Sequence, residues 1–171
     1  MPEEKLERIA NLACHMAGMQ SHPFPLLIKN AEKVYGRARE NGMEPSEKEV
    51  AASVAAYELL DHSRFRTEQR QVIDETGQRI VQSIGPEAFL DYIRDVSNGF
   101  VDNTKTLRFM GEYAQKAKAE GREVSAEELI EYGEGQQEKA NTIIIPEGTG
   151  YMKRKRERDF RREMGLQNWR N

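Results

Sequence analysis

Residues 46–62 read SEKEVAASVAAYELLDH and predict the helix around which the rest of the chain is built. Ser46 and Glu49 have the spacing of a capping box, and Pro45 limits any helix upstream. One stripe of this helix carries Val50, Val54, Tyr57 and Asp61, and small residues fill much of the remainder: Ala51, Ala52, Ala55 and Ala56. Because alanine leaves the helix backbone nearly bare, we expect neighbouring helices to pack closely against it.

Apolar residues at helical spacing predict further helices on both sides of this stretch. They cover residues 3–19, a segment from Pro25 to Asn41, residues 64–84, residues 89–96, a segment from Thr104 or Thr106 to Gly121, and a segment that starts at Ser125. We expect Thr104 or Thr106 to cap its helix, and Gly133 and Gly135 to weaken the last one. Proline and glycine mark the breaks between them. The sequence therefore predicts an all-α protein, a compact bundle of about six to eight short helices.

Residues 64–84 are unusually polar for a helix of a bundle. Isoleucine and valine recur along it, but residues 74–79 are almost wholly polar. A mostly solvated helix is the prediction, and a helix partly covered by a second subunit is the alternative.

Two turns between predicted helices share a motif. The segment that starts at Gly42 and the segment that starts at Gly121 both read G-x-E-x-S-x-x-E followed by Val or Leu, and Ser125 and Glu128 form a second capping box. The flanking sequences diverge, so we interpret the match as convergent turn chemistry rather than as a repeat. Helices that begin with acidic residues are also unsuited to reading a DNA groove.

The chain divides by charge into an acidic body, residues 1–140, and a basic end, residues 151–171. Between them, residues 141–150 form a linker with one β-like run, 142–146, which we expect to lie as an extended strap over the helices. Residues 151–171 carry a net charge of +5, whereas the other 150 residues carry −8. A net charge of −3 for the 171 residues hides this segregation.

The basic end predicts an amphipathic helix. Arginines recur at helical spacing, and Met152, Phe160 and Met164 form a thin apolar stripe. A cationic face attracts phosphate backbones, and arginine can fork onto a phosphate. The candidate nucleic-acid-binding residues are Lys153, Arg154, Lys155, Arg156, Arg158, Arg161 and Arg162.

An internal role for these cations is the competing interpretation. The segment before the linker carries an acidic stripe at helical spacing, formed by Glu127, Glu131, Glu134 and Glu138. If the basic end folds back onto this stripe, its arginines are structural, and Phe160 and Met164 dock on the body.

Residues suited to catalysis or metal binding do not form a recognisable set. His15, His22 and His62 lie in separate segments, and Cys14 has no plausible histidine partner. Glu58 and His62 have i, i+4 spacing, which we interpret as a solvated pair rather than as a metal site. We therefore expect no cofactor, no metal and no enzymatic activity.

Composition excludes a membrane-spanning protein. No apolar run approaches the roughly 20 residues that a membrane-spanning helix requires, and no secretory signal opens the chain. A single cysteine excludes an internal disulfide. These features favour a cytoplasmic protein.

Two functional hypotheses follow from the charge pattern. The first is a binding protein that contacts DNA, RNA or a nucleoprotein assembly through the basic C-terminal helix, with a protein partner at the acidic body or a homo-oligomer through residues 64–84. The second is a protein-binding adaptor or inhibitor whose acidic body masks a partner's basic surface, with its basic end packed on its own body. A small helical enzyme is the third possibility.

Overall fold

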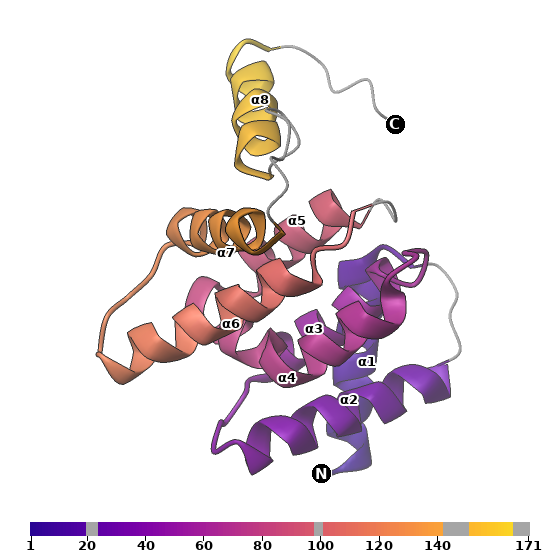
Figure 1. Cartoon of the computed structure of the whole chain (residues 1–171). Helices are drawn as coiled ribbons and strands as arrows, with labels where there is room; N and C mark the ends of the chain where they lie inside the picture. The colour runs from indigo at the N-terminus through magenta and orange to yellow at the C-terminus, as the bar shows by residue number, and fades with distance from the viewer. Residues whose placement is uncertain (20–23, 98–100, 142–150, 166–171) are drawn as a thin grey trace.

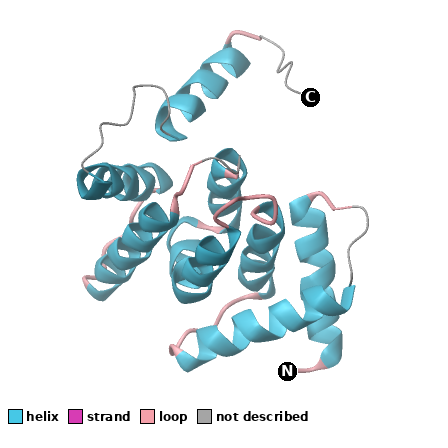
Figure 2. Cartoon of the chain, turned by 45° about the vertical axis from the view of Figure 1, so that its right-hand side comes forward, coloured by secondary structure: helices cyan, strands magenta, loops and turns pink. Residues whose placement is uncertain are grey.

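The computed structural model describes residues 1–19, 24–97, 101–141 and 151–165, which form eight α-helices and no strand (Figures 1 and 2). The helices are α1 Glu3–Ala17, α2 Phe24–Glu40, α3 Glu47–Leu59, α4 Arg66–Ile84, α5 Pro86–Val96, α6 Thr104–Ala119, α7 Ala126–Asn141 and α8 Tyr151–Glu163. The all-α prediction is confirmed. The predicted strap, 142–146, lies outside the described residues.

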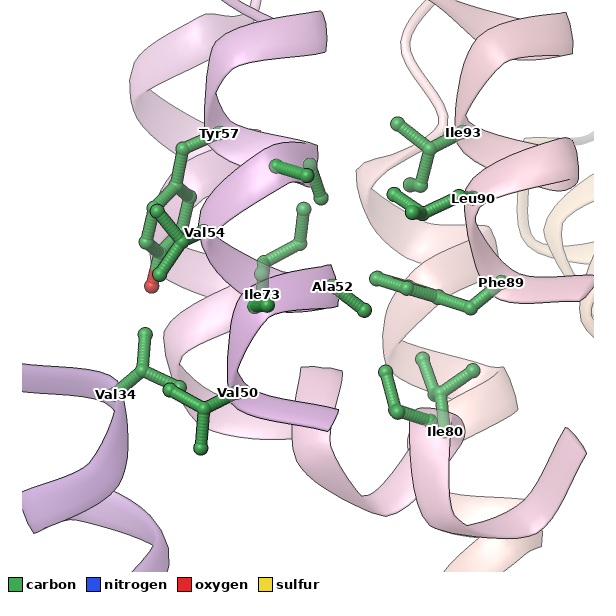
Figure 3. Close-up of a cluster of buried hydrophobic side chains, with 14 of the residues drawn as sticks. Val34, Val50, Ala52, Val54, Tyr57, Ile73, Ile80, Phe89, Leu90 and Ile93 are labelled. Carbon is green, nitrogen blue, oxygen red and sulfur yellow. The ribbon is translucent and has the colours of Figure 1, made fainter. Parts of the chain in front are cut away.

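Helix α3 lies at the centre, as predicted. Ser46 Oγ accepts a hydrogen bond from Glu49 N at 3.2 Å, and Ser46 N donates to Glu49 Oε2 at 3.1 Å, which completes the capping box. Every residue from Val50 to Tyr57 is buried, and α1, α2, α4 and α5 all pack against this helix. In Figure 3, Val50 lies near Val34 of α2.

The alanines of α3 allow this close packing. Ala51, Ala52, Ala55 and Ala56 are all fully buried, and Figure 3 shows Ala52 opposite Phe89 of α5. The helix ends at Leu59, three residues earlier than predicted, so His62 lies in the following turn and shares no helix face with Glu58.

Helix α4 contradicts the prediction of a mostly solvated helix. It packs against α3, α5 and α6, and three residues of its polar middle, Thr76, Gly77 and Gln78, are buried. Gln78 Nε2 donates to Ser53 Oγ at 2.6 Å, and Gln69 Nε2 donates to Asn103 Oδ1 at 2.6 Å. The exposed side chains of α4 are Arg66, Thr67, Glu68, Gln71 and Glu75. Self-association through residues 64–84 stays a prediction.

The start of α6 is stabilised by residues outside its own first turn. Neither Thr104 nor Thr106 caps it with its side chain, contrary to expectation. Instead, Asp102 Oδ1 accepts from Thr104 N at 2.9 Å, and Gln137 Oε1 of α7 accepts from Thr106 N at 2.7 Å. A buried amide from a distant helix therefore satisfies a backbone donor that a local cap was expected to satisfy.

The two turns with the shared motif have the same geometry. Gly42 and Gly121 both have positive φ, 75° and 68°. The next residue in each turn donates its N–H back to an alanine carbonyl five residues earlier, at 2.9 Å after Gly42 and at 2.8 Å after Gly121. The second capping box is only half formed: Ser125 Oγ accepts from Glu128 N at 3.1 Å, but the Glu128 carboxylate binds Arg122 instead.

None of the helices in the described ranges combines the length and the apolar character that crossing a bilayer requires.

Candidate nucleic-acid and protein interface

Helix α8 contains all seven residues predicted to bind nucleic acid. It runs from Tyr151 to Glu163 and ends at a glycine turn, with Gly165 at a φ of 69°. Both views place it at one end of the molecule, beside α7 and α5 (Figures 1 and 2). The predicted helix is therefore present, and its orientation decides which cations meet solvent.

The basic face of α8 is turned toward the body. Arg154 Nε lies 2.7 Å from Asp95 Oδ2, and Arg158 Nη2 lies 3.5 Å from Asp95 Oδ1. The Asp95 side chain is only 11% exposed, so its charge requires a partner, which the two guanidinium groups supply. Asp95 belongs to α5, and no local sequence pattern connects it with residues about sixty positions later, so the sequence did not indicate its role.

A second ion pair joins α8 to α7. Lys155 Nζ binds Glu127 Oε1, and this hydrogen bond lowers the pKa of the Glu127 carboxyl. Glu127 belongs to the predicted acidic stripe, so one contact of the internal interpretation is present. Glu131 and Glu138, two other members of the stripe, are exposed.

The opposite face of α8 carries two exposed apolar side chains and an arginine. Arg156, Phe160 and Met164 are spaced by four residues and lie on one side of the helix. Phe160 is 59% exposed and Met164 is 62% exposed, so the expectation that they dock on the body when the arginines pair internally is wrong. We call these three residues the outer stripe. An amphipathic helix would normally bury such side chains, but here the ion pairs to Asp95 and Glu127 hold its basic face inward.

The predicted nucleic-acid-binding residues therefore do not form one solvent-facing surface. Arg154, Lys155 and Arg158 contact the body, and Arg161 is half-buried. Arg156 and Arg162 are exposed and form no ion pair with the described residues. The side chain of Lys153 lies outside what the structure describes.

The described ranges contain no cluster of three or more His, Cys, Asp or Glu side chains that could hold a metal ion. Cys14 is a half-buried free thiol beside the apolar core. No protein-family model, curated protein or solved structure matches this chain.

Proposed function

We propose that this chain is a non-enzymatic adaptor that binds another protein through the outer stripe of α8 and the neighbouring acidic surface. The observation that carries the proposal is the exposure of Phe160 and Met164 on a helix whose charged face is occupied internally. Large apolar side chains held at the surface and surrounded by charges are typical of protein-binding sites.

The charged residues around the outer stripe indicate which side chains the partner's surface should carry. Glu157, Asp159 and Glu163 of α8 are exposed, as are Glu131 and Glu138 of α7. A partner that buries Phe160 would therefore meet the α8 carboxylates, which lie on the same helix. We infer a partner with an apolar socket surrounded by lysine or arginine, which agrees with an adaptor or inhibitor that masks a basic surface.

Affinity capture from nuclease-treated cell extract tests this proposal. We expect a partner that survives nuclease treatment with the wild-type chain and is lost with the double variant Phe160→Ala/Met164→Ala, because removal of a buried aromatic anchor typically costs about 2 kcal/mol or more of binding energy. The purified partner should then bind the variant with a Kd at least about tenfold higher than its Kd for the wild-type chain.

Leu26→Ala is the matched control, since Leu26 is also an exposed apolar residue, 43% exposed, but lies on α2. It should retain the partner. Capture that disappears with nuclease, or that is equal for the α8 variant and the control, would contradict the proposal.

Contact with nucleic acid is the second candidate function. Exposed Arg156 and Arg162, which form no ion pair with the described residues, favour it. Fluorescence anisotropy with unrelated duplex DNA and single-stranded RNA over a range of salt concentrations tests it. Arg156→Gln/Arg162→Gln should weaken binding and reduce the salt slope by about 2, because two phosphate contacts are lost.

Lys29→Gln/Lys116→Gln removes the same charge from exposed positions on α2 and α6 and serves as the control. Equal losses in both double variants would show that net charge alone governs binding. An absence of binding at low salt would exclude this function.

A further inference from the structure

The two turns with the shared motif line the same groove. Asn41 and Met43 come from the first turn, and residues 121–124 come from the second. Helices α4 and α6 supply the remaining wall, and the groove encloses about 600 Å³. Figure 1 shows the ends of α2 and α6, where these turns begin, on the left of the molecule. Pockets that bind small molecules commonly have this size.

The groove is positively charged although the body around it is acidic. Arg79 of α4, Lys118 of α6 and Arg122 of the second turn line it, and Glu123 is the one carboxylate among its described lining residues. Among the lining residues alone, three cations stand against one carboxylate. This excess stands out against the net charge of −8 of residues 1–150.

The three cations differ in how firmly the protein itself binds them. Arg122 is held by Glu128 at 3.0 Å and by Glu120 at 3.7 Å. Lys118 Nζ makes a long hydrogen bond, 3.4 Å, to Gln82 Oε1. Arg79 makes no ion pair with any described residue. Lys118 and Arg79 therefore retain donors and charge for a ligand.

Neutral groups complete a surface suited to an organic anion. Side chains of Gln82, Ser83 and Gln115 line the groove and can donate hydrogen bonds. Met43 and Val124, both nearly buried, supply apolar contact at its base. The site thus combines a cationic part with an apolar part, as pockets for small metabolites do.

We propose that this groove binds a small organic phosphate, with the phosphate group held by Arg79 and Lys118. A phosphate monoester carries a charge of about −1.5 to −2 at neutral pH, enough to pair with both Arg79 and Lys118, whereas a single carboxylate leaves one of them unpaired. Arginine also forks onto phosphate oxygens, and lysine adds a compact charge. The apolar base accommodates the organic part of the ligand.

Binding to the full-length protein tests the proposal with five probes: AMP, glucose 6-phosphate, adenosine, inorganic phosphate and a phosphoserine peptide. Calorimetry measures affinity, and backbone amide NMR shifts locate the site. We expect one of the phosphorylated small molecules to bind and to shift the amides of residues 41–43 and 121–124. Adenosine should bind at least about tenfold more weakly than AMP if the phosphate supplies the contact.

Arg79→Gln and Lys118→Gln should each weaken this binding about tenfold, because each removes a charge-assisted hydrogen bond. Arg108→Gln is the control, since Arg108 is an exposed α6 cation that does not line the groove. The proposal is overturned if neither AMP nor glucose 6-phosphate binds at about 10 mM. It is equally overturned if only the phosphoserine peptide binds, or if Arg108→Gln weakens binding as much as Arg79→Gln.

Discussion

At the scale of single residues, glycines determine how closely the helices approach. A Cβ atom at Gly111 of α6 would lie 2.5 Å from Cβ of Thr76 on α4, and one at Gly133 of α7 would lie 2.9 Å from the backbone oxygen of Thr106. Gly133 was expected only to weaken its helix. Its position instead allows α7 to lie close against α6. The close packing of the two helices outweighs the low helix propensity of glycine.

Gly111→Ala should lower the free energy of unfolding by about 1–3 kcal/mol, because the added methyl group overlaps Thr76 and forces the two helices apart. Gly36→Ala is the control: it changes a helical glycine with nothing within 4 Å of the added Cβ. That control should raise stability by about 0.5–1 kcal/mol. Urea denaturation of both variants measures the difference, and a Gly111→Ala protein as stable as wild type would show that α4 and α6 are farther apart.

At the scale of helices, the orientation of α8 depends on one carboxylate. Asp95 binds both Arg154 and Arg158, and Lys155 adds a pair to Glu127. These contacts decide that cations face the body and that the outer stripe faces solvent. Helical periodicity predicted both faces of α8 but contained no information about which one faces inward.

Asp95→Asn should loosen α8, because a neutral amide attracts the two guanidinium groups far less strongly. We expect hydrogen exchange of the α8 amides to become about tenfold faster, while exchange in α3 stays unchanged. Asp91→Asn removes an exposed charge one turn earlier in α5 and should leave α8 exchange as in wild type. Unchanged exchange in Asp95→Asn would show that α8 is held by other contacts.

At the scale of the whole molecule, two buried tyrosines connect stability to alkaline pH. Burial raises the pKa of the Tyr57 hydroxyl, and its hydrogen bond to Asp74 raises it further. Burial likewise raises the pKa of Tyr92. In the unfolded chain a tyrosine loses its proton near pH 10. The folded protein therefore keeps protons that the unfolded chain releases.

The free energy of unfolding should accordingly be maintained below about pH 10 and fall as the pH rises above it, by about 1.4 kcal/mol per pH unit for each of the two tyrosines. Denaturant titrations from pH 8 to pH 12 measure this slope. Tyr57→Phe should reduce the slope by about 1.4 kcal/mol per pH unit, the contribution of one tyrosine. An equal slope in the variant and the wild-type protein would contradict the assignment.

The sequence alone was sufficient for features that depend on neighbours within about one helical turn. The capping box at Ser46, the glycine turns and the apolar faces of α1, α2 and α5 all follow from local spacing, and each is present in the structure. The alanine-rich stretch also predicted a central α3, since small side chains allow helices to approach from several sides. Local chemistry therefore determined the all-α fold.

Only the tertiary structure decided which polar groups are buried and where cations gather. Residues 74–79 made α4 look solvated, but Gln78 is buried and donates to Ser53, and Gln69 is buried and donates to Asn103, both partners distant in sequence. Asp95 likewise holds the basic face of α8 toward the body. The basic groove forms where two turns that are distant in the sequence lie beside α4. Each outcome depends on pairs far apart in the chain, because a polar or charged group can be buried only where the fold brings it a partner.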